Sequence, residues 1–181
     1  ETTANLLTWL TSLLARRPDV AQKLEEEYQR VGISSLKDPL GSLSYAFDCF
    51  RLGLSEYPVA TTTTRKTAED IVAGGVFIPK GTLIQANAYE LTRHIFGDGD
   101  QFSRDRLDYQ VFELVYSLLF GLSRRCLGQP IAELEGTMAL SMLAGTFNFS
   151  ALTEEMPEPQ IATVLTAKKG KARKVVMTLK Q

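Results

Sequence analysis

The sequence has 181 residues and a net charge of -1 at pH 7, with 44% apolar and 23% charged residues. This composition is typical of a globular domain, and the near-neutral charge gives no reason to expect a nucleic-acid partner. One histidine and two cysteines are too few for a disulfide framework or a structural zinc site. The sequence contains no run of 18 apolar residues, so it predicts no membrane-spanning helix.

The first third of the sequence predicts three helices. Leucines recur at helical spacing in residues 1–14, and the pattern is already running at residue 1, so we expect a further segment upstream. Pro18 suits the first turn of a second helix, which ends near Val31 before Gly32. Residues 42–56, SLSYAFDCFRLGLSE, predict a third helix that the following Tyr-Pro pair ends.

The remainder predicts short strands, irregular connections and one long helix. The β-branched run at residues 60–66 favours a strand, and residues 74–88 favour two short strands around a Pro-Lys-Gly turn. His94 is interpreted as a loop residue, and residues 97–109 as a polar connection. The other predicted elements are a helix over 128–147 and a terminal hairpin with strands 162–167 and 174–179 around the solvated basic turn KKGKAR. This order indicates an α+β fold.

One of the two cysteines, Cys126, lies in the stretch FGLSRRCLGQ, just before the long predicted helix. Unpaired amide groups at a helix start, together with Arg124 and Arg125, favour a thiolate there. A nucleophilic thiolate needs a base, and no His or Asp lies nearby in sequence. A heme iron needs one thiolate, amide donors to its sulfur and cations for the propionates. The residues alone leave open a heme ligand, a redox-sensing thiol or a small buried cysteine in a turn.

Longer segments favour the first of these interpretations. ETTANLL, RKTAEDIVAGGVFIPKGTLIQANAY, FGDGDQFSRDRL and CLGQPIAELEG follow one another in this order. With these segments the chain resembles the C-terminal half of the cytochrome P-450 family, the heme-thiolate monooxygenases. LSYAFDCFRLGLSEY and SRRCLG are most similar to fungal microsomal members. The resemblance runs nearly end to end, and we therefore expect residues 1–181 to be a single partial domain that lacks the N-terminal half of the family's fold.

The resemblance implies an enzyme that oxidises a small organic substrate with heme (iron protoporphyrin IX) as its cofactor. Electrons would come from an NADPH-dependent cytochrome reductase. Family members are often bound to the endoplasmic reticulum, but these residues contain no membrane anchor and lead us to expect a soluble, cytoplasmic chain. The residues that match the family's functional positions are Glu1 and Thr2 for oxygen activation, Cys126 as axial iron ligand, Arg65 and Arg124 for the propionates, and Gly128 beside the cysteine.

The family pattern is broken at two places. Leu52 and Ser55 stand where the family has Glu-x-x-Arg, although Asp48 and Arg51 have that spacing one turn earlier. The arginine at position 106 therefore lacks its usual carboxylate partner. The loop before the cysteine is one residue short, with leucines at positions 119 and 122 where the family has Phe and Gly.

These departures support a second hypothesis: a truncated, degenerate relative without heme or redox activity, acting as a non-oxidative enzyme, a binding protein or a homo-oligomer. Its partner would be a second copy, bound through an exposed apolar face on the first helix that is formed by Leu6, Leu7, Leu10, Leu13 and Leu14. A third hypothesis keeps only the thiol chemistry and makes Cys126 a redox sensor.

Overall fold

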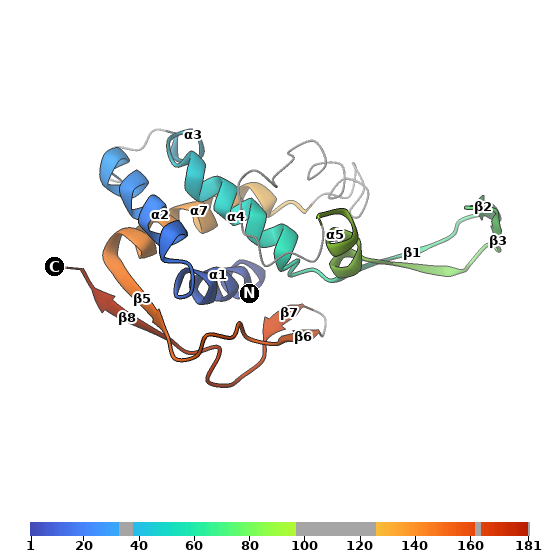
Figure 1. Cartoon of the computed structure of the whole chain (residues 1–181). Coiled ribbons are helices and arrows are strands. Elements are labelled where there is room, and N and C mark those ends of the chain that lie inside the picture. The colour runs from blue at the N-terminus through green and yellow to red at the C-terminus, as the bar shows by residue number, and fades with distance from the viewer. Residues whose placement is uncertain (33–37, 97–125, 162–163, 181) are drawn as a thin grey trace.

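The computed structural model describes residues 1–32, 38–96, 126–161 and 164–180. Within them, a helical body carries four small antiparallel sheets of two strands each (Figure 1). The fold is α+β, as the sequence predicted. No helix in the described ranges is both long and apolar enough to cross a bilayer.

The predicted boundaries of the first helices are largely confirmed. Helix α1 covers Thr2–Leu14 and α2 covers Pro18–Val31, with Pro18 in its first turn. Gly32 ends α2 with φ 67°, a conformation in which a glycine has no Cβ clash. The predicted third helix is α4 (Ser44–Glu56), which begins two residues later than expected. A short helix that was not predicted, α3 (Pro39–Ser42), precedes it. The chain leaves α4 at the predicted Tyr-Pro pair.

Helix α7 (Gln129–Thr146) packs against α1, α2 and α4 and is the central helix of the body (Figure 1). Small residues permit these contacts, because Gly136 lies under Phe50 of α4 and Gly145 lies against Tyr28 of α2. Leu140 and Ala144 add apolar surface to the same core. The body of the molecule is therefore organised around the helix that directly follows Cys126.

The predicted dimer face on α1 is wrong. Leu6 and Leu10 are each 1% exposed, and Leu13 and Leu14 are also buried. Leu7 is half-buried and packs against the same core cluster. The leucine stripe is covered by the chain's own helices because α4 and α7 both lie against α1. The stripe therefore belongs to the core and is not a surface for a second copy.

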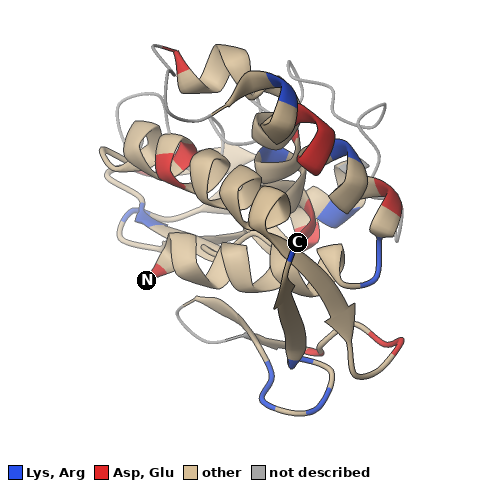
Figure 2. Cartoon of the chain, turned by 90° about the vertical axis from the view of Figure 1, so that its left-hand side faces the viewer, with Lys and Arg blue, Asp and Glu red and all other residues tan. Residues whose placement is uncertain are grey.

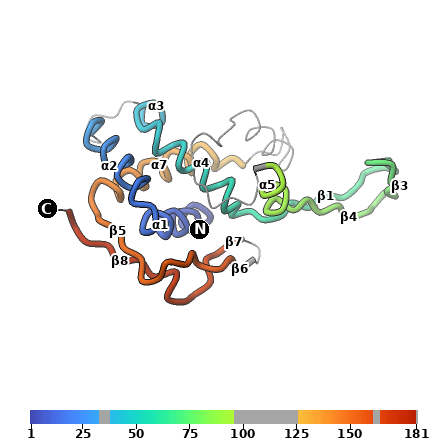
Figure 3. Tube along the Cα trace, in the orientation of Figure 1, coloured from blue at the N-terminus to red at the C-terminus, as the bar shows by residue number. Residues whose placement is uncertain are grey.

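An extended β arm projects from the helical body (Figures 1 and 3). It consists of β1 (Thr62–Lys66) paired with β4 (Leu83–Asn87), and of β2 (Ile71–Ala73) paired with β3 (Val76–Ile78). Two glycines with φ 57° and 79° turn the chain between β2 and β3, as a tight hairpin requires. The sequence predicted β1, β3 and β4 but not β2. Large apolar side chains are exposed on the arm, namely Val72, Val76, Phe77 and Leu83.

Helix α5 (Ala88–Phe96) joins the arm to the body. No separate helix was predicted here, and His94 lies on α5 rather than in a loop. The backbone N–H of Glu90 donates to the Asn87 side chain at 3.2 Å, so Asn87 caps the first turn. This capping asparagine was the signal in the sequence that could have identified the helix.

The predicted terminal hairpin is also wrong. Strand β7 (Leu165–Ala167) pairs with β6 (Pro159–Ile161), whereas β8 (Val175–Leu179) pairs with β5 (Phe147–Ala151). Strand β5 follows α7 directly, and β8 is fixed beside it by Lys180, whose Nζ lies 2.6 Å from Glu25 Oε2. Leu165 of β7 is instead buried beside Trp9. The basic loop between β7 and β8 is exposed, as predicted (Figure 2).

Candidate functional site

Cys126 lies immediately before α7, at the start of a turn that leads into the helix. Its carbonyl oxygen accepts a hydrogen bond from the backbone N–H of Gln129 at 3.1 Å, and the carbonyl of Gly128 accepts from Ala132 at 2.9 Å. The thiol is exposed and is not part of a disulfide. The interpretation of Cys126 as a small buried cysteine is therefore wrong. Cys49 is the buried cysteine, as expected for the face of α4.

Gly128 caps the N-terminus of α7 with φ -82° and ψ -2°. Any residue adopts this conformation, so the backbone alone does not require a glycine. A Cβ at this position would lie 3.7 Å from the sulfur of Cys126, at ordinary van der Waals contact. A larger side chain would thus lie beside the thiol, and the glycine leaves that side of the sulfur open.

The N-terminus of α7 supplies positive potential at the thiol. It has no side-chain cap and no acidic residue in its first turn. Two of its first backbone positions offer no free donor, because the N–H of Gln129 donates to the Cys126 carbonyl and Pro130 has no N–H. The positive end of the helix dipole nevertheless lies at this terminus. Arg124, the predicted neighbouring cation, lies outside the described residues, as do the leucines at 119 and 122.

The α4 positions that depart from the family pattern are buried. Leu52 and Ser55 are both covered, and Ser55 Oγ donates to the carbonyl of Arg51 at 3.3 Å. Asp48 is buried one turn earlier. Arg51 Nη2 lies 3.5 Å from Oε1 of Glu133 on α7. The sequence analysis missed Glu133, and no local signal identified it because its partner is more than 80 positions away in the sequence. The predicted arginine at position 106 lies outside the described residues.

The remaining predicted site residues lie on other elements. Arg65 is exposed on β1, where its Nη1 donates to Thr63 Oγ1 at 2.7 Å and to the Thr64 carbonyl at 2.9 Å. Glu1 and Thr2 are exposed at the N-terminal end of α1. The structure places these three residues and Cys126 on three different elements.

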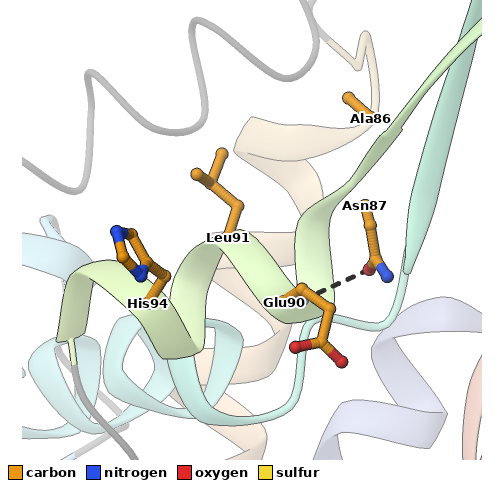
Figure 4. A pocket seen from close by; sticks show the side chains of 5 residues that line it. All are labelled: Ala86, Asn87, Glu90, Leu91 and His94. Carbon is orange, nitrogen blue, oxygen red and sulfur yellow. Dashed lines mark hydrogen bonds between the residues drawn. The ribbon is translucent and has the colours of Figure 1, made fainter.

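A shallow pocket of 520 Å³ lies between the end of β4 and α5. It is lined by Ala86, Asn87, Glu90, Leu91 and His94. Figure 4 shows the carboxylate of Glu90 turned away from the imidazole of His94. Among the described residues, the pocket therefore brings no acid–base pair together, and its described lining includes none of the predicted site residues. The described part of the chain also contains no cluster of three metal-ligating side chains.

The residues at Cys126 fit a heme at the level of donor chemistry. A porphyrin supplies four ligands to its iron, so the protein needs to contribute one axial donor. Cys126 is exposed, is not part of a disulfide and has an open side toward Gly128. The positive end of the α7 dipole lies beside the turn that carries Cys126, which favours an anionic ligand there.

Comparisons with known proteins agree with this chemistry. The sequence profile described as Cytochrome P450 matches residues 1–175. The chain is 30% identical to a pentalenene oxygenase of Streptomyces avermitilis, over 98% of this chain and 42% of the relative. It is 32% identical to a cytokinin hydroxylase of Arabidopsis thaliana, over 94% of this chain and 34% of the relative. It is 30% identical to Cytochrome P450 3A6 of Oryctolagus cuniculus, over 85% of this chain and 32% of the relative.

The chain thus spans between about a third and two fifths of the length of these relatives. Proteins of this family bind heme. The match covers α1, α4, the β arm, the Cys126 turn and α7 together, so it includes each of the elements above that carries a predicted site residue. The chain belongs to the cytochrome P450 family.

Proposed function

We propose that this chain is the cysteine-bearing portion of a heme-thiolate monooxygenase, with Cys126 as the axial ligand of the heme iron. The observation that carries the proposal is the exposed thiol of Cys126 at the uncapped N-terminus of α7, inside the segment that matches the family. When bound, the heme supplies reductive activation of dioxygen and insertion of one oxygen atom into an organic substrate. Residues 1–181 act in this proposal as one domain, the C-terminal portion of the family's fold.

The chain's own groups have separate tasks in this proposal. The N-terminus of α7 and Arg124 hold the sulfur of Cys126 as a thiolate. Arg65 and Arg124 bind the propionates, and for this Arg65 exchanges its hydrogen bonds to the β1 threonines for a carboxylate. Glu1 and Thr2 would carry protons in from solvent, a role that suits their exposed place at the start of α1.

The substrate is proposed only by class, as a small organic molecule. The names of the relatives point to different molecules, since one is a pentalenene oxygenase and another a cytokinin hydroxylase. The electrons come from a flavoprotein reductase. Similarity to bacterial, plant and mammalian members supports the reaction type. Membership of the fungal microsomal branch stays a prediction.

An absorption spectrum tests the proposal. The purified chain is supplied with heme, reduced and exposed to carbon monoxide, next to the variants Cys126→Ser and Cys49→Ala. We expect a Soret band strongly shifted to the red in the wild type and in Cys49→Ala, and its loss in Cys126→Ser. A folded, monodisperse wild-type chain that takes up no heme contradicts the proposal.

One observation favours the alternative of a relative without redox activity. Leu52 and Ser55 are buried where the family has an ion-pairing glutamate and arginine, so these two positions cannot form the family's ion pair. The same spectrum separates the two candidates. If heme is absent, loss of a redox response in Cys126→Ser would support the sensor function of the exposed thiol.

A further inference from the structure

Helices α4 and α7 lie in direct contact beside the Cys126 turn. Phe50 of α4 is buried against Gly136 of α7, which leaves no room for a side chain at that position. Tightly packed interfaces of this kind transmit displacement rather than absorb it. Any group that fixes the start of α7 against α4 therefore also fixes the turn that carries the thiol.

Arg51 and Glu133 are such groups. Nη2 of Arg51 lies 3.5 Å from Oε1 of Glu133, and their side chains are only 13% and 11% exposed. The guanidinium also lies 4.6 Å from the ring centroid of Phe47, on the same face of α4. A planar guanidinium held by an aromatic ring is oriented before it meets its carboxylate.

The ion pair continues toward Cys126 through hydrogen bonds. Oε1 of Glu133 accepts from the side-chain amide of Gln129 at 3.1 Å. The backbone N–H of Gln129 in turn donates to the carbonyl of Cys126 at 3.1 Å. A continuous series of polar contacts thus leads from α4 to the main chain of the cysteine.

We propose that Arg51 and Glu133 are positioning residues for Cys126, and that they take over in this chain the bracing task of the Glu-x-x-Arg pair that Leu52 and Ser55 replace. The pair holds the first two turns of α7 in register with α4. That register in turn sets how the thiol is oriented toward a heme. This last step rests on the proposed function. Both residues act through the Cys126 turn and contact no reacting atom.

The test uses Arg51→Met, Glu133→Gln and the double variant, which remove the charges at nearly constant size. The matched control is the exposed ion pair of Lys168 and Glu158, changed to Lys168→Met and Glu158→Gln. Amide hydrogen exchange, measured in the absence of heme, reports the opening of the hydrogen bonds at Gln129 and Ala132. We expect exchange there to become at least about tenfold faster in each Arg51 or Glu133 variant, because the buried ion pair between α4 and α7 is lost.

Because the two residues act as one unit, the double variant is expected to change exchange by less than the product of the single effects. Exchange in α2 stays near wild type, and the control variants leave the Cys126 turn unchanged. Equal acceleration in every helix would show general destabilisation and overturn the proposal, as would unchanged exchange at Gln129. If Arg51→Met does not fold, Arg51→Lys, which keeps the charge without the planar group, must show the same local acceleration to a smaller degree.

A second measurement separates this inference from the proposed function. If the wild type shows the thiolate Soret band, folded Arg51 and Glu133 variants are expected to lose a measurable fraction of it at equal heme content. If a variant exchanges faster at Gln129 and still shows the full thiolate Soret band, the ion pair does not orient the thiol of Cys126. A wild type without heme contradicts the proposed function, while the exchange data still decide whether the pair positions the turn.

Discussion

Gly136 on α7 lies directly under the ring of Phe50 on α4, so close that a methyl group on the glycine would overlap the Cε2 edge of the ring. This contact sets the separation of the two helices at the Cys126 end of α7. The polar link between Arg51 and Glu133 lies within one turn of the contact on both helices. Apolar packing thus limits the distance between α4 and α7, and the ion pair links the same stretches of the two helices.

Gly136→Ala is expected to destabilise the chain by about 1 kcal/mol or more. Overpacking a core typically costs about 1–3 kcal/mol, which exceeds the gain of roughly 0.5–1 kcal/mol from replacing a helical glycine by alanine. The midpoint of urea unfolding measures the effect. Phe50→Leu in the same background removes the ring and should recover part of the loss. A higher midpoint for Gly136→Ala alone would mean that the ring can move aside.

Glu27→Ala is expected to lower the free energy of unfolding by about 2 kcal/mol. Although it lies in the charged run KLEEEYQR, Glu27 is buried on α2 and accepts the backbone N–H groups of Tyr45 at 2.8 Å and Ala46 at 2.9 Å. It therefore caps the N-terminus of α4 from another helix, a position where a carboxylate acceptor is favourable. Glu26→Ala, an exposed change on the same helix, is the control. Equal effects of the two variants would contradict this capping role.

The ion pair of Arg17 and Asp19 should give a pH-dependent contribution to stability. Arg17 donates to both carboxylate oxygens of Asp19, at 2.9 Å and 2.8 Å, and these hydrogen bonds lower the pKa of Asp19 below its ordinary 3.8. A carboxyl group with a lowered folded pKa stabilises the chain above its unfolded pKa. That contribution is lost as the pH falls through the folded value.

Asp19→Asn is therefore expected to cost about 0.2–1 kcal/mol near pH 6, a range set by solvent screening because the side chain is 54% exposed. The difference from wild type should shrink as the pH falls below 3.8 and disappear once the pH lies below the lowered pKa of Asp19. Urea midpoints at the two pH values measure it, and Arg17→Met should show the same trend. A difference that persists in acid would assign the effect to the first turn of α2 rather than to the ion pair.

Lys180→Met should loosen the sheet formed by β5 and β8. Lys180 donates to the carbonyl of Ala144 at 2.7 Å and pairs with Glu25, so one ammonium holds β8 against α7 and α2. Amide hydrogen exchange in residues 147–151 and 175–180 is expected to become several-fold faster, with α4 unchanged. Lys174→Met, an exposed change just before β8, provides the comparison. If both variants exchange alike, the lysine does not anchor the strand.

The sequence was most informative where the determining interactions are local. Pro18 and Gly32 mark the two ends of α2 because proline suits a first turn and glycine suits a left-handed cap. The β-branched threonines indicate strand β1 for a similar reason, whereas β2 and its Gly-Gly turn were not predicted. Cys126 could be placed before a helix from its neighbours alone, and the order of the longer segments was enough to suggest the family.

Strand pairing and burial depend on contacts between distant residues, and there the sequence reasoning was wrong. β8 pairs with β5 rather than with β7, and Lys180 just after β8 contacts Glu25 of α2 and Ala144 of α7. The leucines of α1 looked available to a partner, yet α4 and α7 cover them.

The sequence by itself determined the α+β class, the ends of the main helices and the place of Cys126 before α7. Only the tertiary structure decided that Cys126 is exposed, that Glu27 caps α4 and that Arg51 meets Glu133. The physical reason is the range of the interactions. Helix caps and turns depend on a few neighbouring residues, whereas burial and ion pairs between helices depend on which surfaces meet when the whole chain packs.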